Sequence, residues 1–470
     1  MNDTQRSGDS AEPLGPPQAD GGEKISTTES LCPVCLAVLP AEIRRRGEDV
    51  LLVRECPEHG LFAEAIWRGE PRFESWQRPK SPAAGVKIHR EHDRGCPFDC
   101  GLCPEHAQHP CTVLFEITSR CNLRCPVCFA DSGGDAPFPP LAALAEHLRW
   151  VREQAGEVVL QLSGGEPTLH PDLVPLTAEA ARLFPGVQLN TNGLRLAEEP
   201  GLARRLAGAG LSWVFLQFDG VSDRSFEIIR GRKLLDIKMA AIEACARAGL
   251  SVVLAPTVAA QVNDHELGGL LRLAVSLAPT VRGLHIQPMT SAGRNSLTGA
   301  AHRLTLPEVL GKLAEQSGGL VQPEQAFPPS CEHERCSFHL RYRRTASGDL
   351  IPLSHNNSCC CKTTDAPSSP EETAAGRDRS VAVTLRSWQG PAPLIPMAGA
   401  KPDALDEFLA QARRETFSVT CMAFQDAWTA DLARLRGCCV HIFRPPNRFL
   451  PFCAANLTAA DGRALYPRHE

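Results

Sequence analysis

Cysteine spacing constrains this chain more than any other feature of its sequence. Many of its 20 cysteines fall into short groups, and in a reducing compartment such groups are more typical of metal or iron–sulfur ligands than of disulfides. The group that bears most on the fold is Cys121, Cys125 and Cys128, which directly follows an apolar run. Three thiolates on one short loop can ligate three irons of a cubane and leave the fourth iron open. A zinc knuckle is the competing interpretation, because Cys-Pro-Val-Cys also occurs in zinc sites.

From residue 112 onward, short apolar runs alternate with amphipathic stretches, as parallel βα units do. Strands are predicted at Val113–Thr118, Glu157–Ser163, Val187–Thr191, Trp213–Asp219, Ser251–Val258 and Arg282–Gln287. Helices are predicted between them at Leu141–Gln154, Asp172–Phe184, Leu202–Ala209, Ile237–Ala248 and His265–Leu277. These units predict an α/β fold, an incomplete (βα)6 barrel, with its site in the loops at the carboxyl ends of the strands.

Polar residues mark the ends of three predicted strands. The second strand ends in Gly164, Gly165, Glu166 and Pro167, directly after Ser163. Asn190 and Asn192 follow on the third strand, and Asp219 on the fourth. We expect the two asparagines and Asp219 to face a bound ligand; helix capping is the alternative for Asp219. Arg230 could pair with a ligand carboxylate, although a surface role is as reasonable.

The cysteine loop and the Gly-Gly-Glu-Pro element together resemble the radical S-adenosylmethionine (SAM) superfamily. The resemblance implies that Cys121, Cys125 and Cys128 hold a catalytic 4Fe-4S cluster, which reductively cleaves SAM to a 5'-deoxyadenosyl radical. It also implies that the Gly164–Pro167 element binds the methionine amino group, with Glu166 as acceptor. A low-potential electron donor such as ferredoxin or flavodoxin would be the redox partner.

Further cysteines predict additional metal sites. Cys96, Cys100, Cys103 and Cys111 suggest a closed auxiliary 4Fe-4S cluster, with structural zinc as an alternative; their spacing also mimics the SAM-binding loop. Cys32, Cys35, Cys56 and His59 form two knuckles typical of a rubredoxin-like zinc module. Iron is an alternative there, and His59 could be a turn residue. A second auxiliary cluster is predicted from the late cysteines Cys331, Cys336, Cys421, Cys438 and Cys453.

The other cysteines receive no ligand role at this point. Cys439 belongs to the same late pool, and some of these thiols could simply be buried hydrophobes. Cys245 lies in a helical pattern and is expected in the core. Cys359, Cys360 and Cys361 are unassigned.

These patterns divide the chain into successive regions. A disordered leader is predicted at 1–30, the zinc module at 31–70, an auxiliary-cluster segment at 90–111 and the barrel at 112–320. A C-terminal auxiliary-cluster region is predicted at 321–361 and 381–470, around a disordered linker at 362–380.

Charge and hydropathy limit the partners. The net charge of −5 argues against nucleic acid, whose phosphates select basic surfaces. Residues 1–30 lack a secretory signal pattern, and the apolar stretches are shorter than a membrane span. We therefore expect a cytoplasmic protein whose membrane contact, if any, is peripheral.

The order of motifs from Cys32 to Leu457 resembles one subfamily, which contains the archaeal tetraether lipid synthases and dihydropterin methylase-like relatives. The chain departs from it at Cys359–Cys361 and in the linker that follows. The synthases imply carbon–carbon bond formation on a lipid alkyl chain, which we favour here because the auxiliary-cluster framework matches throughout. The relatives imply radical methylation of a reduced pterin or another small molecule. A non-enzymatic zinc or iron–sulfur module would explain the cysteines but not the barrel and the Gly-Gly-Glu-Pro element.

Overall fold

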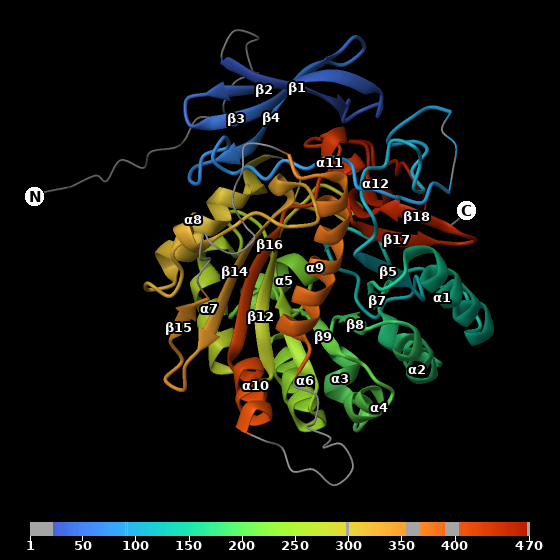
Figure 1. Cartoon of the computed structure of the whole chain (residues 1–470), viewed down its shortest axis with the longest axis vertical. Coiled ribbons are helices and arrows are strands. Elements are labelled where there is room, and N and C mark those ends of the chain that lie inside the picture. Colours follow the sequence, from blue (N-terminus) through green and yellow to red (C-terminus); the bar gives the residue numbers. More distant parts are fainter. Residues whose placement is uncertain are drawn as a thin grey trace, which may run out of the picture.

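A computed structural model describes residues 22–89, 91, 93–297, 300–353, 367–390 and 404–467. Cys359, Cys360 and Cys361 lie outside these residues. Figure 1 shows a curled central sheet with helices on its outer side and a small sheet at one end.

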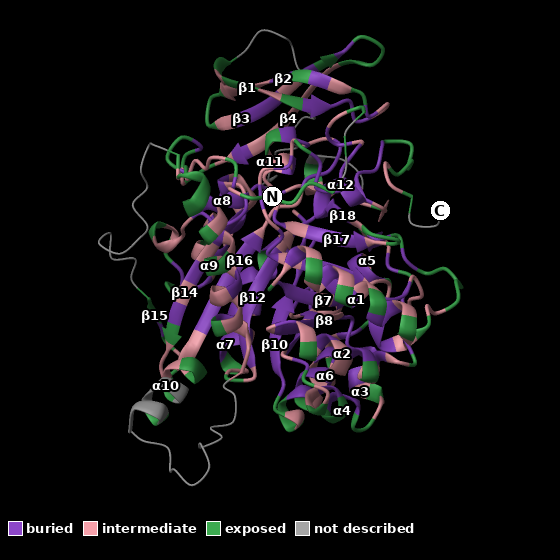
Figure 2. Cartoon of the chain, turned by 45° about the vertical axis from the view of Figure 1, so that its right-hand side comes forward, coloured by how far each residue is buried: buried purple, intermediate pink, exposed green. Residues whose placement is uncertain are grey.

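The core of the molecule is a curled parallel sheet. Its strands run in the order β5 (Thr112–Glu116), β7 (Val159–Ser163), β8 (Gly186–Thr191), β9 (Trp213–Gln217), β10 (Ser251–Ala255) and β12 (Val281–Pro288). Each strand is parallel to the next. Figure 2 shows that these strands are largely buried, as apolar strands covered on both faces should be. They correspond to the six predicted strands, and the predicted incomplete barrel is confirmed.

Helices connect these strands. They are α1 (Leu141–Ala155), α2 (Leu173–Leu183), α3 (Leu194–Glu198), α4 (Leu202–Gly208), α5 (Asp223–Arg230), α6 (Leu235–Ala248) and α7 (Leu267–Ser276). Short strands β6 (Val127–Cys128) and β13 (Arg294–Asn295) pair with each other, and β11 (Thr257–Val258) pairs with β12. Because β6 contains Cys128, its pairing with β13 stabilises the end of the Cys121–Cys128 loop.

The C-terminal region extends both edges of the same sheet. β16 (Thr416–Met422) is parallel to β12, and β17 (Val440–Arg444) is parallel to β5. β14 (Ser337–Arg344), β15 (Leu350–Pro352) and β18 (Arg448–Pro451) add antiparallel strands outside them. The chain therefore returns to the barrel after residue 320, where the sequence predicted a separate region. α10 (Ala404–Glu415), α11 (Leu432–Arg436) and α12 (Phe452–Asn456) complete this part, and α8 (Leu306–Gln316) precedes it.

A helix occupies much of the predicted disordered linker. α9 (Pro370–Trp388) begins at a capping box in which the backbone and side chains of Ser369 and Glu372 bond reciprocally. It contacts β10, β12 and β16 and lies in front of the sheet in Figure 1. The prediction of disorder is wrong for residues 370–380, because this polar helix is stabilised by its cap and by the sheet. Residues 362–366 lie outside the described part.

The N-terminal sheet is an antiparallel meander. It consists of β1 (Glu23–Leu31), β2 (Val38–Arg46), β3 (Asp49–Cys56) and β4 (Gly60–Arg68). The predicted leader is therefore wrong over residues 23–30, which form β1, while residues 1–21 lie outside the described part. Arg54 on β3 is buried and donates to the carbonyls of Leu31 (3.0 Å) and Trp428 (2.7 Å), which ties this sheet to the C-terminal region.

Within the described residues, no helix has the length and apolar content needed to cross a membrane. Peripheral membrane contact stays a prediction.

Candidate active site

One cavity of about 530 Å³ brings the predicted SAM-binding residues together. Its walls include Cys121, Cys125, Cys128, Gly164, Gly165, Glu166, Asn190, Asn192 and Arg230. It continues past them to Cys111, which precedes β5, whereas the cysteine loop follows β5. Since a strand rises about 3.3 Å per residue, the five residues of β5 separate these two ends by roughly 17 Å. The cavity thus extends along the inside of the barrel.

The Cys121–Cys128 loop is held from two sides. Arg294 donates to the carbonyl of Cys125 (2.8 Å) and pairs with Asp131 (2.7 Å). Arg230 donates to the carbonyl of Val127 (3.0 Å). Burial raises the pKa of Cys121 to about 12, and the nearby charges of Glu166 and the other two thiols add to this effect. Burial also raises the pKa of Cys125, and thiols that are costly to ionise alone fit a cationic iron cluster, which compensates their charge.

The two glycines permit close packing against this loop. A Cβ on Gly164 would lie 2.2 Å from the carbonyl oxygen of Thr118, and a Cβ on Gly165 would lie 2.2 Å from that of Arg120. The backbone nitrogens of Gly165 and Glu166 donate to these carbonyls at 2.8 Å. The glycines therefore join the second strand end to the start of the cysteine loop.

Glu166 is buried and joins two strand ends. Its Oε1 accepts from the backbone nitrogen and hydroxyl of Thr168 (3.1 and 2.6 Å) and from the hydroxyl of Thr191 (2.6 Å). Its Oε2 accepts from the backbone nitrogen of Asn192 (2.7 Å). Because Oε2 has one donor among the described residues, it keeps capacity for a further donor, such as an ammonium group.

Asp219 and Arg230 bond to each other. The guanidinium Nε and an Nη each lie 2.7 Å from a carboxylate oxygen of Asp219, and Arg230 also donates to the Thr257 hydroxyl (2.9 Å). Asn192 similarly donates to Asn122 (2.8 Å) and accepts from the Leu194 backbone nitrogen (3.0 Å). These side chains anchor the cysteine loop and α3 to the strand ends. Asn192 and Arg230 also line the cavity, so their contact with a ligand stays a prediction.

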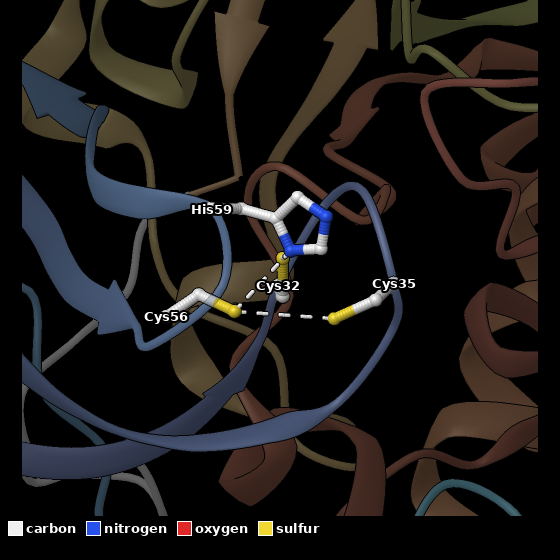
Figure 3. A group of neighbouring side chains, drawn as sticks. All are labelled: Cys32, Cys35, Cys56 and His59. Carbon is white, nitrogen blue, oxygen red and sulfur yellow. Dashed lines mark hydrogen bonds between the residues drawn. The ribbon is translucent and has the colours of Figure 1, made fainter.

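The four N-terminal ligands assemble as predicted. Figure 3 shows Cys32, Cys35, Cys56 and His59 pointing toward one another. Their ligand atoms all lie within 4.8 Å of one another, with Cys35 and Cys56 sulfurs 3.9 Å apart and His59 Nδ1 3.4 Å from the Cys56 sulfur. A tetrahedral zinc thiolate site separates its sulfurs by about 3.8 Å, so the set fits zinc.

Cys111 lies apart from the group to which the sequence assigned it. Its sulfur, with those of Cys331 and Cys439, forms a buried trio within 4.8 Å, and the Cys111 and Cys439 sulfurs are 2.9 Å apart. Hydrogen bonds from these two thiols hold the pKa of Cys111 well below its usual range. The pairing with Cys439 arises because β5 and β17, which the two cysteines directly precede, are neighbours in the sheet.

The remaining predicted ligands form two further neighbourhoods. Cys96, Cys100 and Cys103 surround a small pocket with His106, whose buried Nε2 has no hydrogen-bond partner within the described residues. Elsewhere, the pKa of Cys438 is raised by burial and by the charges of Cys453 and Cys336. This places Cys336, Cys438 and Cys453 near one another.

Cys421 stands outside these groups. It lies on β16 and faces the cavity, and burial alone raises its pKa. Cys245 is in the core, as expected.

Several cavity residues went unnoticed in the sequence. They are polar or aromatic side chains that project from strands or α9: Gln161, Phe215, His285 and Trp388. Gln217, in a polar strand end that the sequence did single out, lines the cavity as well. A glutamine within an otherwise apolar strand was the available signal. His285 is buried, and burial lowers its pKa to about 3, so its ring is neutral at physiological pH.

Comparison with known proteins decides the family. The radical SAM superfamily model matches residues 115–274, and the HMPTM N-terminal zinc ribbon domain matches residues 24–68. Over 473 aligned positions the chain is 31% identical to the 7,8-dihydro-6-hydroxymethylpterin dimethyltransferase of Methanocaldococcus jannaschii, covering 91% of this chain and 93% of that one. The chain belongs to the radical SAM family. The prediction of an enzyme that uses a 4Fe-4S cluster and SAM is thereby confirmed, as is the N-terminal zinc module.

Other similarities of this radical SAM enzyme are more partial. It is 28% identical to molybdenum cofactor biosynthesis protein 1 of Bos taurus, over 68% of this chain and 50% of that protein. Among solved structures, Streptococcus suis SuiB bound to precursor peptide SuiA matches 45% of this chain and 46% of that one, at 15% identity and a TM-score of 0.38.

Proposed function

We propose that this radical SAM enzyme methylates a reduced pterin related to 7,8-dihydro-6-hydroxymethylpterin. The observation that carries the proposal is the mixed lining of the cavity. Side-chain amides and hydroxyls line it together with aromatic rings; they include Gln161, Ser163, Asn190, Gln217, Thr257, Phe215 and Trp388. A pterin has flat faces that can stack on rings and edges that can bond to amides.

The same lining disfavours the alkyl chain that we expected from the sequence. Burying an amide against hydrocarbon leaves its hydrogen-bonding groups without partners, which costs roughly 1–3 kcal/mol for each group. The similarity to a pterin dimethyltransferase over nearly the whole chain points the same way. We therefore favour pterin methylation over lipid coupling.

Roles within the site follow from its contacts. Cys121, Cys125 and Cys128 would hold the cluster, which when bound supplies the electron for reductive cleavage of SAM. The free capacity of Glu166 Oε2 suits the SAM ammonium group. Arg230, paired with Asp219, would position the cysteine loop through the Val127 carbonyl.

The other thiol groups are proposed metal sites. Cys111, Cys331 and Cys439 would hold an iron ion beside the cavity, because sulfurs within 4.8 Å of one another suit a single ion. Cys96, Cys100 and Cys103 would hold an auxiliary cluster, and the Cys336, Cys438 and Cys453 neighbourhood adds candidate ligands. A ferredoxin or flavodoxin would supply electrons.

The test is turnover by the anaerobically reconstituted full chain. SAM would serve both as radical source and, in a second molecule, as methyl donor. With SAM, a low-potential reductant and 7,8-dihydro-6-hydroxymethylpterin, we expect 5'-deoxyadenosine and methionine from the first role, S-adenosylhomocysteine from the second, and a pterin heavier by one or two methylene units in mass spectra. A parallel reaction contains a saturated-chain lipid in place of the pterin. Coupled alkyl chains there, with unchanged pterin in the first reaction, would replace this proposal with lipid synthesis.

A further inference from the structure

A relay of side-chain hydrogen bonds crosses three strands in the cavity wall. Trp213 Nε1 on β9 donates to Gln188 Oε1 on β8 at 2.7 Å. Gln188 Nε2 donates to Asn190 Oδ1 at 2.5 Å, and Asn190 Nδ2 donates to Gln161 Oε1 on β7 at 3.0 Å. The relay ends at Gln161, which lines the cavity.

The chemistry of its first member fixes the direction of the whole relay. An indole nitrogen can only donate, so Gln188 must present its oxygen to Trp213 and its amino group to Asn190. Asn190 then accepts from Gln188 through its oxygen and donates to the Gln161 oxygen through its amino group. Trp213 and Gln188 are both fully buried, so no water competes at the start of the relay.

Gln161 is consequently left with its amino group unused. Within the described residues its Nε2 has no hydrogen-bond partner, although its oxygen is occupied by Asn190. The amide nitrogen of Gln161 thus offers the cavity two unused N–H donors, while its oxygen, which already accepts from Asn190, keeps one lone pair.

Aromatic rings line the same cavity, two strands away from this donor. Asn190 is paired in register with Phe215 on the neighbouring strand. The Phe215 ring lies 5.3 Å from the His285 ring and 6.0 Å from the Trp388 ring, measured between centroids, and all three line the cavity. Flat rings stack at such surfaces.

We propose that Gln161 is a specificity-determining residue that donates a hydrogen bond to a ring carbonyl oxygen of a flat heterocyclic substrate. This rests on the proposed function and narrows it, because it states which edge of the ring faces β7. Trp213, Gln188 and Asn190 act as positioning residues that keep the donor pointed at the cavity. A substrate without an acceptor at this point would bury the Gln161 amide unpaired and bind less well.

The test compares two substrates in the reconstituted full chain. One is 7,8-dihydro-6-hydroxymethylpterin; the other is its 4-amino analogue, in which a donor replaces the ring carbonyl. We expect the unmodified chain to favour the carbonyl form in kcat/KM by about tenfold, the contribution of one well-placed hydrogen bond. Gln161→Glu keeps the side-chain shape but only accepts, so the preference should invert. Trp213→Phe, which removes the fixed donor, should weaken the preference without inverting it.

A matched control lies on the same cavity. Thr384 on α9 lines it, but its hydroxyl already donates to the Ser380 carbonyl (3.0 Å), so Thr384→Val should keep the preference of the unmodified chain. If the unmodified chain methylates the pterin and Gln161→Glu still prefers the carbonyl form, this inference is wrong while the proposed function stands. If Thr384→Val shifts the preference as strongly, the inference is also wrong. If the unmodified chain processes neither compound, the proposed function and this inference both fail.

Discussion

Two of the cysteine groups among the described residues differ in how they are assembled. Cys32, Cys35, Cys56 and His59 lie within one small sheet, and Cys32 and His59 are 27 residues apart. Cys111, Cys331 and Cys439 come from three distant segments, and Cys111 and Cys439 are 328 residues apart. Both groups bring their ligand atoms within 4.8 Å. The small sheet β1–β4 is sufficient for the first, whereas the second exists only once the barrel sheet is complete.

The two groups also differ in burial and in access to the cavity. The Cys111 group is buried, and Cys111 faces the cavity that holds the predicted SAM-binding residues. The N-terminal group lies at the end of the molecule, with His59 exposed. We therefore expect the local group to stabilise its own sheet and the distant group to take part in the reaction.

The largest effect is expected at a third group, Cys121, Cys125 and Cys128. Its members are close in sequence, like those of the N-terminal group, and they face the cavity, as Cys111 does. Replacing Cys121, Cys125 and Cys128 together by Ala should abolish 5'-deoxyadenosine formation and remove about four irons, because no open iron would remain to bind SAM. Iron analysis and chromatography of the reaction measure both. SAM cleavage that persists in this variant would mean that another loop, such as Cys96–Cys103, holds the catalytic cluster.

The next prediction tests the comparison directly with one cysteine from each group. Cys439→Ala should lose iron, keep zinc, and lower methylated product at least a hundredfold. Cys56→Ala should lose about one zinc, keep its iron and retain most of the product. Metal analysis together with product assays on both variants distinguishes the groups. If Cys439→Ala retained as much methylated product as Cys56→Ala, the Cys111 group would have a structural role only.

Much of the barrel could be predicted because buried parallel strands are continuous apolar runs. The predicted strand Val187–Thr191 differs from β8 by one residue, and Trp213–Asp219 begins where β9 does. α9 was missed for the opposite reason. Its residues facing the cavity include Ser380, Thr384 and Ser387, so its pattern lacks the apolar stripe that marks a helix. The Ser369 and Glu372 capping box was the readable signal.

The candidate site could be predicted where ligands share a loop and not where partners come from separate elements. Spacing identified the Cys121–Cys128 loop and the N-terminal zinc ligands. It assigned Cys111 to its sequence neighbours, since nothing in the spacing indicates that β17 pairs with β5. The Asp219–Arg230 pair was missed likewise, because a charge pattern does not say whether an arginine meets a ligand or a buried carboxylate.

A further prediction concerns the range over which zinc acts. In Cys56→Ala, hydrogen exchange should accelerate in β1–β4 and stay slow in β5–β12, since the zinc ligands all belong to the small sheet. Mass spectrometry of peptides after exchange measures this region by region. Fast exchange throughout the barrel would contradict the view that the local group stabilises only its own sheet.

The smallest effect is expected at the contact between the two regions. Arg54 donates to carbonyls of Leu31, Ala427 and Trp428, and burial lowers the pKa of its guanidinium to about 10. Arg54→Met should therefore lower the free energy of unfolding of the small sheet by about 2 kcal/mol, because the carbonyls lose their donors while the cost of burying a charge is relieved. Arg54→Lys should lose less, since an ammonium can still reach one carbonyl. Denaturation followed by zinc release measures the small sheet alone. If Arg54→Met instead abolishes iron binding at Cys439, the two regions are coupled, and the division between a local structural group and a distant functional one is wrong.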